Sequence, residues 1–307
     1  MAQPIQKVAL IGASGNLGPT VLDEFLRSSF EVTVITRQES HATFPETVTV
    51  IKTLYTFDSL VRGLTGQDAV VSLVGADGVS GQKVMIDAAI KAGVKRFLPS
   101  EFGCDTSNPK VLEIAPFLRG KREIVEYLQS RESEIGWTAV ITGPFADIVK
   151  FHPGWGITSG FLQFDLQRRS ATIWDDGTVP FTQTTMAQVA RALVCVLKSP
   201  VETANQYVYV ESYTASQMDI LRALQNATGN VCEATHLKAQ DRLRGVREAF
   251  VSGLVSGDVI VGAILGATIG PEQLGNFSGR SIKRAIGLEP EGLDEVISEL
   301  AKGRLTN

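Results

Sequence analysis

Near its N-terminus the sequence reads Lys7-Val-Ala-Leu-Ile-Gly12-Ala-Ser-Gly15-Asn-Leu-Gly18, and this segment sets the architecture of the first half of the chain. The apolar run over 7–11 predicts a buried β-strand, which leads into three glycines with the spacing Gly-x-x-Gly-x-x-Gly. The first glycine suits a tight turn, the second the close approach of backbone N–H groups to a pyrophosphate, and the third the packing of a helix. A helical pattern over 19–27 comes next, and its N-terminus would offer free N–H donors to phosphates. The segment predicts a dinucleotide-binding loop; a turn with only a structural role is the alternative.

Outward from this loop, short β-branched runs alternate with helical patterns through the first half of the chain. We expect strands over 7–11, 31–36, 48–51, 69–74, 96–99 and 137–142, and helices over 19–27, 57–64, 81–92 and 117–129. Such alternation is typical of βαβ units in a parallel sheet, with right-handed crossovers as the default. The predicted fold class is α/β, a Rossmann-type doubly wound parallel sheet of six strands.

The regular alternation ends after residue 144. Residues 145–180 show no clear period, and beyond them we expect a helix over 183–198, a strand over 206–210, and helices over 216–228, 238–253 and 292–302. The apolar run 253–270 is rich in glycine and falls short of a transmembrane helix, so packed or mobile structure is expected there. The predicted organisation is an NAD(P)-binding domain of residues 1–150 with 181–210 returning to it, and a smaller discontinuous α/β substrate-binding lobe of residues 151–180 and 211–307.

Composition and charge exclude several classes of protein. The chain has 307 residues, of which 44% are hydrophobic and 20% charged, as in ordinary globular proteins. Its 29 basic residues against 33 acidic ones give a net charge of −4, so neither nucleic acid nor an anionic membrane is expected as a partner. No secretory leader is visible, and a cytoplasmic protein is expected.

Cysteine and histidine spacing gives no sign of a metal site. The three cysteines are scattered without a Cys-x-x-Cys pair, which argues against a disulfide framework and for a reducing compartment: Cys104, Cys195 and Cys232. The three histidines have no spacing that places two of them on one helical face: His41, His152 and His236. The motifs of serine hydrolases and P-loop enzymes are also absent from the sequence.

The end of the second predicted strand indicates which dinucleotide binds. NAD enzymes place an acidic residue there for the ribose 2′-hydroxyl, whereas this strand ends in Thr36-Arg37-Gln38. Arg37 is a permanently charged, planar donor suited to a 2′-phosphate, which favours NADP. The alternative is a solvated arginine neutralised by Glu39.

Lys121 lies on the wrong side of its predicted helix for a surface lysine. By i, i+4, i+7 spacing the apolar stripe contains Phe117, Ile124, Val125 and Leu128, and Lys121 points with it. Withdrawal from water lowers the pKa of a lysine, which suits proton transfer near neutral pH. The alternative is a lysine that snorkels along the edge of the core. No tyrosine of the chain is followed by lysine four residues later, so the usual Tyr-x-x-x-Lys pair of short-chain reductases is missing.

Several segments together resemble the isoflavone reductase-like, NmrA-like family of atypical short-chain dehydrogenases/reductases. They are the glycine loop 12–18, Arg37, Asp87-Ala-Ala-Ile-Lys-Ala-Gly93-Val-Lys-Arg-Phe, Pro99-Ser-Glu-Phe-Gly103, and Lys121 seven residues before Leu128. The likeness covers residues 5–150 well and 180–225 loosely. It implies a Rossmann domain with a discontinuous substrate lobe and NADPH-dependent reduction of small aromatic molecules.

The resemblance also implies roles for individual residues. Lys121 takes the place of the family's general acid/base, and Arg37 that of the arginine for the 2′-phosphate. The cofactor-binding residues are then Gly12, Ser14, Gly15, Asn16, Leu17, Gly18, Arg37, Val74, Gly75, Lys121, Pro144 and Phe145. Glu101 and Phe102 would shape the nicotinamide side rather than do chemistry.

Candidate substrate contacts lie where the lobe begins. His152 could hydrogen-bond a substrate oxygen, although an ordinary loop histidine is the alternative. The aromatic residues of this region could wall a pocket or form the core of the lobe: Trp155, Phe161, Phe164 and Trp174. The chain departs from the plant reductases at Glu123-Ile-Val-Glu126, where they carry paired arginines, and at Gly143-Pro-Phe-Ala-Asp147, so the substrate is not carried over from them.

The leading hypothesis is an NADPH-dependent reductase of a small aromatic or conjugated metabolite, with Lys121 as general acid/base. A non-catalytic dinucleotide-sensing regulator of the NmrA type is one alternative, and a redox-neutral isomerase or cyclase on the same fold is another. Lys121 favours an enzyme, because a sensor has no need of a desolvated lysine. Either a monomer or a homodimer is compatible with the sequence.

Overall fold

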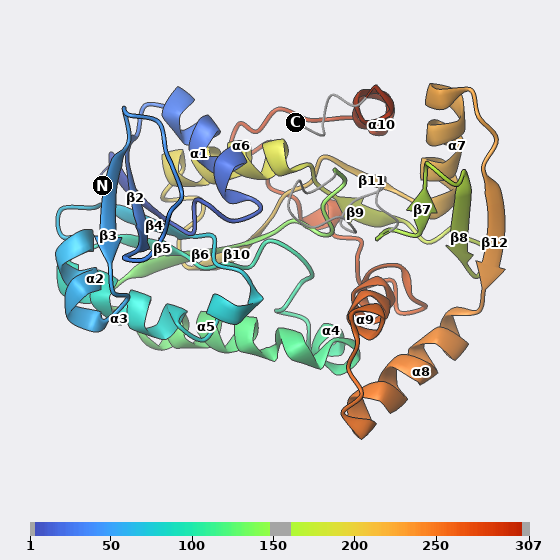
Figure 1. Cartoon of the computed structure of the whole chain (residues 1–307), viewed down its shortest axis with the longest axis horizontal. Coiled ribbons are helices and arrows are strands. Elements are labelled where there is room, and N and C mark those ends of the chain that lie inside the picture. The colour runs from blue at the N-terminus through green and yellow to red at the C-terminus, as the bar shows by residue number, and fades with distance from the viewer. Residues whose placement is uncertain (1–3, 148–160, 303–307) are drawn as a thin grey trace.

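A parallel β-sheet of seven strands forms the centre of the molecule. The structure is a computed structural model that describes residues 4–147 and 161–302. The strand order is β10-β6-β5-β4-β1-β2-β3, and all six pairings are parallel (Figure 1). The strands are β1 (Lys7–Ile11), β2 (Glu31–Arg37), β3 (Thr49–Thr53), β4 (Ala69–Ser72), β5 (Arg96–Leu98), β6 (Gly136–Ile141) and β10 (Gln206–Tyr209). The strand order reverses between β1 and β4, and crevices at such switch points bind ligands in open α/β sheets.

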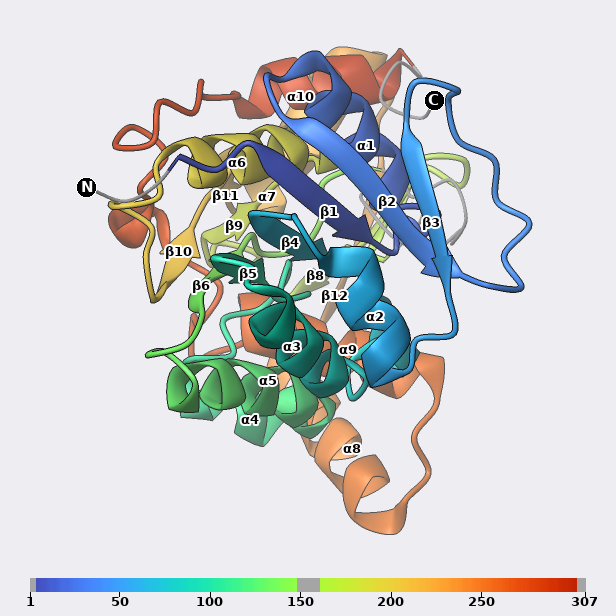
Figure 2. The ribbon, with the colours of Figure 1, turned by 90° about the vertical axis from the view of Figure 1, so that its left-hand side faces the viewer.

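Helices cover both faces of this sheet, as the edge-on view shows (Figure 2). On one face lie α1 (Gly18–Arg27) and α6 (Met186–Lys198), and on the other α2 (Phe57–Leu64), α3 (Gln82–Ala92) and α5 (Arg119–Ser130). Residues of β1 alternate between the two cores: Leu10 packs with the α1 and α6 side and Ile11 with the α2, α3 and α5 side. Strands buried on both faces are apolar throughout, which explains the uninterrupted run over 7–11.

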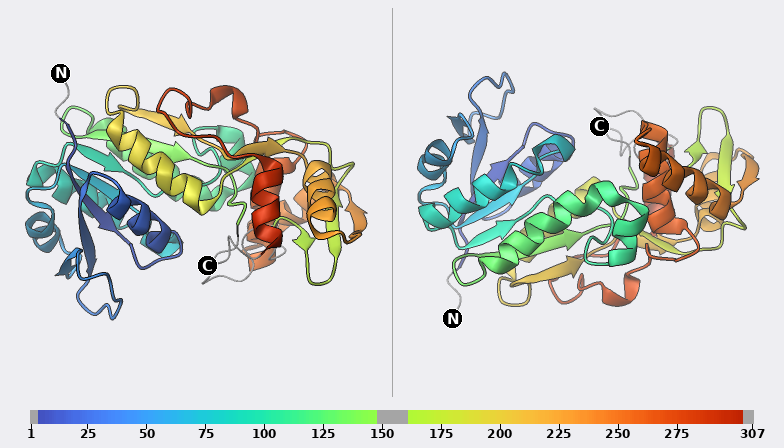
Figure 3. Two further views of the ribbon diagram at one scale, coloured as in Figure 1. Left: turned by 90° about the horizontal axis from the view of Figure 1, so that it is seen from above. Right: turned by 90° about the horizontal axis from the view of Figure 1, so that it is seen from below.

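The remaining elements form a second layered region beside the carboxyl ends of the strands (Figures 1 and 3). Its strands are β7 (Phe164–Asp165), β8 (Ser170–Trp174), β9 (Phe181–Gln183), β11 (Tyr213–Ala215) and β12 (Glu233–Leu237). Its helices are α4 (Pro109–Ile114), α7 (Gln217–Thr228), α8 (Ala239–Ser252), α9 (Gly257–Ile269) and α10 (Leu293–Ala301). The strands pair as β12-β8-β7 and β11-β9, and their apolar faces share one core with α7 and α10.

The predicted α/β class and the six predicted strands are confirmed. The strand expected over 206–210 is a seventh member of the same sheet, because β10 pairs in parallel with β6. The helix expected from residue 183 begins only at Met186, since residues 181–183 form β9. Seven elements of the second region were not predicted: α4, β7, β8, β9, β11, β12 and α9. Of these, β12 is largely exposed, and α9 is a regular helix despite its glycines. None of the helices in the described part of the chain is long and apolar enough to cross a membrane.

Candidate active site

The glycine loop brings the backbone of three segments into close contact. Gly12 has a φ of +88°, and a Cβ there would lie 2.9 Å from the carbonyl carbon and oxygen of Leu73, beyond β4. At Gly18 a Cβ would lie only 2.3 Å from the carbonyl oxygen of Ala13. The first glycine therefore serves the turn, and the third lets α1 begin directly against the loop. A methyl group at either glycine would collide with the backbone of Leu73 or Ala13, so the loop can keep this conformation only with glycine at both positions.

No side chain of the described residues caps the N-terminus of α1. Leu17 occupies the N-cap position with no side-chain hydrogen bond, and Pro19 follows within the first turn. The first N–H groups of a helix have no partner within the helix, and together with the helix dipole they attract anions. In α1 the Gly18 N–H donates to the Gly15 carbonyl, the Val21 N–H donates to the Leu17 carbonyl, and Pro19 has no N–H. The helix dipole and the Thr20 N–H are therefore what the first turn offers to a phosphate group.

A continuous cavity of about 980 Å³ extends from the glycine loop along the carboxyl ends of the strands. Most of the residues proposed from the sequence line it: Gly15, Asn16, Leu17, Arg37, Val74, Gly75, Phe102, Lys121, Pro144 and Phe145. Gly12, Ser14 and Gly18 belong to the loop but not to the cavity wall. His152 and Trp155 fall outside the described residues. The structure therefore brings together side chains from several strand ends and from α5.

Arg37 ends β2 at the rim of this cavity. Its side chain is 71% exposed, and its Nε lies 3.7 Å from Oε1 of Glu39. A solvent-exposed ion pair of that length contributes little free energy and leaves the guanidinium available to a stronger anion. The geometry fits a 2′-phosphate, and it is also compatible with a solvated arginine.

Lys121 lies at the opposite end of the cavity, in the first turn of α5. Its ammonium donates a hydrogen bond to the main-chain carbonyl of Glu101. Burial lowers the pKa of Lys121, while the Glu101 carboxylate opposes this shift. Ile124, Val125 and Leu128 form the buried stripe of α5 as predicted. Lys121 is therefore half-buried and lines the cavity.

The predicted apolar stripe was wrong in one member. Phe117 precedes α5 in a 3₁₀ turn, Pro116–Leu118, so the α-helical period does not extend back to it. Its ring is 40% exposed, lines the cavity and stacks on Phe250 of α8 at a centroid distance of 6.2 Å. Phe117 is therefore part of the cavity wall rather than of the core.

Glu101 is buried beneath Lys121. Its side chain is 1% exposed, and burial raises the pKa of its carboxyl to about 7. Oε2 accepts a hydrogen bond of 2.6 Å from the Thr106 hydroxyl, and Thr106 in turn lies 3.5 Å from the hydroxyl of Tyr207. Among the described residues, none donates a hydrogen bond to Oε1. The segment 99–108, which follows β5, therefore holds a buried carboxyl group beside the cavity.

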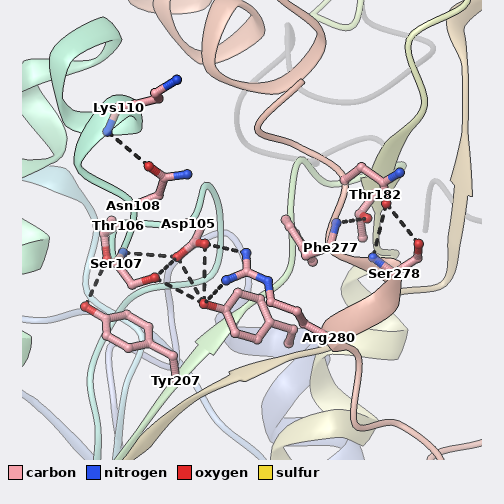
Figure 4. Close-up of polar contacts among 12 residues, drawn as sticks. Asp105, Thr106, Ser107, Asn108, Lys110, Thr182, Tyr207, Phe277, Ser278 and Arg280 are labelled. Carbon is pink, nitrogen blue, oxygen red and sulfur yellow. Dashed lines mark hydrogen bonds and ion pairs between the residues drawn. The ribbon is translucent and has the colours of Figure 1, made fainter. Parts of the chain in front are cut away.

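A polar network ties the segment 99–108 to the chain between α9 and α10 (Figure 4). Asp105 is 1% exposed and accepts a hydrogen bond of 2.6 Å from Nη2 of Arg280. The Arg280 guanidinium also lies over the ring of Tyr209, 3.9 Å from its centroid. Because Asp105 is paired in this way, it holds the loop in place and leaves Glu101 as the carboxyl beside the cavity.

The far end of the cavity is apolar. Ile264 of α9 and Phe161 line it together with Phe117, while Phe102 adopts an uncommon left-handed conformation with a φ of +27°. Non-glycine residues in such conformations are concentrated at functional sites. Of the proposed aromatic wall, Phe161 lines the cavity, whereas Phe164 and Trp174 are buried in the core of the second region.

Sequence reasoning missed Ile264 and Cys104, which both line the cavity. Ile264 lies more than 140 positions from Lys121 in a run without a polar pattern, so no local signal marks it. Cys104 follows the Pro-Ser-Glu-Phe-Gly segment, and that adjacency was the available clue. Within residues 4–147 and 161–302, no cluster of three or more potential metal ligands occurs.

Comparisons with known proteins agree with this geometry. The NmrA-like family model matches residues 4–254. Oxidoreductase aprR of Aspergillus flavus is 35% identical over 306 residues, covering 97% of this chain and 99% of that protein. Isoflavone reductase homolog P3 of Arabidopsis thaliana is 27% identical over 273 residues, covering 81% of this chain and 83% of that protein.

Solved structures show the same fold. The structure described as AtPrR2 with NADP+ and (+)pinoresinol superposes with a TM-score of 0.77 at 21% identity, covering 97% of this chain and 99% of that one. The family model spans most of the chain, and a relative above 30% identity extends along nearly all of it. The chain therefore belongs to the NmrA-like family, within which its isoflavone reductase-like resemblance is confirmed.

Proposed function

We propose that this protein is an NADPH-dependent oxidoreductase that reduces a small aromatic or conjugated metabolite, with Lys121 as general acid/base. One observation carries the proposal: a continuous cavity joins the uncapped N-terminus of α1 to a half-buried lysine of lowered pKa and an apolar wall. The relative aprR is named an oxidoreductase, and a structural neighbour holds NADP+ together with pinoresinol.

The cofactor end fits the group that the family implies. The segment Gly15-Asn16-Leu17 at the N-terminus of α1 would hold the pyrophosphate, and Arg37 the 2′-phosphate. Val74, Gly75, Pro144 and Phe145 would contact the remainder of the cofactor. When bound, NADPH supplies a hydride.

At the other end, the chain's own residues would orient the substrate and move a proton. Phe117, Phe161 and Ile264 offer apolar surface to a ring system. Lys121 would donate its proton from Nζ to the substrate oxygen, since a lysine of lowered pKa releases its proton more readily. In this arrangement the central sheet with its covering helices would bind the cofactor, and the second region, which includes α4 and β9, would cover the substrate.

The experiment is a comparison of wild type with Lys121→Met, a variant of similar length without the charge. NADPH oxidation with a panel of aromatic enones is expected to fall 100-fold or more, as is typical when a general acid is lost, roughly 10²–10⁴. The affinity for NADPH is expected to stay within about threefold by fluorescence titration. Turnover that survives the substitution would refute the role of Lys121, and tight NADPH binding without turnover on any substrate would favour the sensing regulator.

A further inference from the structure

Glu101 is a buried carboxyl group beside the cavity, and one of its two oxygens has no hydrogen-bond partner among the described residues. Its carboxyl is 1% exposed, it adjoins the cavity, and Oε1 has no hydrogen-bond partner among the described residues although Oε2 receives the Thr106 hydroxyl. A buried polar atom without a partner costs free energy, about 1–3 kcal/mol, and such atoms in folded proteins call for a reason. Glutamine or an apolar residue would avoid part of this cost at the same position.

The charged groups around Lys121 leave Glu101 as its main counter-charge. Burial raises the pKa of the Cys104 thiol, which therefore stays neutral near pH 7. Asp105 is paired with Arg280. The other charged residues that line the cavity are exposed and screened by solvent: Arg37, Asp77, Lys83 and Glu123. Within the described residues, no carboxylate forms a direct ion pair with Lys121, so the Glu101 charge acts through space at the floor of the cavity.

We propose that Glu101 is a positioning residue for Lys121: its main-chain carbonyl orients the ammonium, and its buried carboxylate keeps that ammonium protonated until a substrate oxygen takes the proton. The proposal rests on the role given to Lys121 above. Desolvation by itself favours a neutral lysine, which accepts a proton but has none to give. A negative charge on the buried Glu101 favours the acid form of Lys121, because a charge inside the protein is screened less than one in water. Glu101 would thus set the pH below which the reductase works.

The neighbours of Glu101 fit this role. The Thr106 hydroxyl and the nearby Lys121 and Arg122 charges favour the ionised carboxyl, whereas burial and Asp105 disfavour it. The net result is a pKa of about 7, so Glu101 changes charge within the physiological range. The carboxylate and the ammonium stabilise each other, and the two groups are expected to titrate as a coupled pair.

The test measures Lys121 directly and needs no turnover. The purified full-length chain without cofactor is labelled with acetic anhydride between pH 6 and pH 11, and mass spectrometry quantifies acetylation of Lys121 at each pH. In Glu101→Gln the midpoint is expected to fall by about one pH unit or more, since one unit charge is removed in a poorly screened site. Glu101→Asp, which keeps the charge but shortens the side chain, should lie closer to wild type than Glu101→Gln does. A purely structural role predicts the reverse order, because glutamine preserves the shape.

Two further variants complete the design. Glu126→Gln also changes a glutamate to glutamine, but on an exposed side chain of α5, the helix that carries Lys121. This variant should leave the midpoint of Lys121 acetylation where it is in wild type. Thr106→Val removes the hydrogen bond to Oε2 but keeps the carboxyl, so its midpoint should move in the same direction as in Glu101→Gln and by less. Coincident midpoints in wild type, Glu101→Gln and Thr106→Val would overturn the proposal. Because labelling is read on the free protein, this result stands whether or not Lys121→Met abolishes reduction.

Discussion

The two ends of the cavity differ in which part of the chain forms them: mainly backbone at one end and mainly side chains at the other. At the proposed cofactor end the backbone is expected to make the contacts: glycines permit close packing of the loop, and α1 begins without a side-chain cap. At the substrate end side chains from segments far apart in the chain form the wall, including Phe117 before α5 and Ile264 of α9. Backbone geometry tolerates few substitutions, whereas a wall of apolar side chains can be exchanged residue by residue. The cofactor should therefore be the fixed property of this fold and the substrate the variable one.

The largest expected effect comes from the backbone end. In Gly18→Ala the new methyl group would lie 2.3 Å from a backbone oxygen, which no side-chain rotation can relieve. We expect the loop to shift, destabilising the protein by about 1–3 kcal/mol. NADPH affinity should fall about tenfold or more, because the shifted loop would misplace the N-terminus of α1 and a hydrogen bond to a charged group is worth roughly 1.5–3 kcal/mol. Thermal unfolding and fluorescence titration measure the two effects.

Gly245→Ala is the matched control for this substitution. Gly245 lies within α8, and a Cβ there meets no described atom within 4 Å. Alanine in a helix interior is favoured over glycine by about 1 kcal/mol, so this variant should be more stable than wild type with unchanged NADPH affinity. Equal behaviour of the two glycine variants would show that the cofactor end does not depend on close backbone contact.

A smaller effect on NADPH affinity is expected at Arg37, the side chain proposed to select NADPH over NADH. Arg37→Ala should weaken NADPH binding about tenfold to thirtyfold, because an exposed arginine–phosphate contact contributes roughly 1.4–2 kcal/mol. NADH binding should be unaffected, since it lacks the 2′-phosphate. Arg62→Ala removes another exposed arginine, on α2, and should change neither affinity. An unchanged NADPH-to-NADH ratio in Arg37→Ala would favour the solvated arginine paired with Glu39.

The same contrast explains what could be predicted from the sequence. Strands buried on both faces and the glycine spacing are local patterns, so the sheet and the loop were found at nearly their observed positions. Lys121 was found because the helical period reveals a charged residue on an apolar face. The apolar wall could not be predicted for two reasons. Ile264 of α9 approaches the segment before α5 only through long-range packing, and Phe117 lies in a 3₁₀ turn where the α-helical period does not hold. The electrostatic importance of Glu101 depends on its burial, which no local spacing encodes.

The smallest expected effect concerns the substrate end. Phe117→Ala removes a ring that is 40% exposed and stacked on Phe250, so the free energy of unfolding should change by less than about 1.5 kcal/mol. The KM for an aromatic substrate should rise about threefold to tenfold, because apolar burial is worth roughly 25 cal/mol per Å² and only part of one ring face is lost. The affinity for NADPH should not change. Steady-state kinetics with varied substrate and, separately, varied NADPH distinguishes the two ends of the cavity.

Phe57→Ala is the matched control for the expected rise in KM. Phe57 is 41% exposed, almost the same as Phe117, but it begins α2 and does not line the cavity. Both variants lose a half-exposed ring, so any general effect on packing should be similar in the two. If only Phe117→Ala raises KM, the ring acts on the substrate through the cavity wall. If both variants raise KM equally, or if Phe117→Ala weakens NADPH binding instead, Phe117 does not contact the substrate and the proposed position of the substrate is wrong.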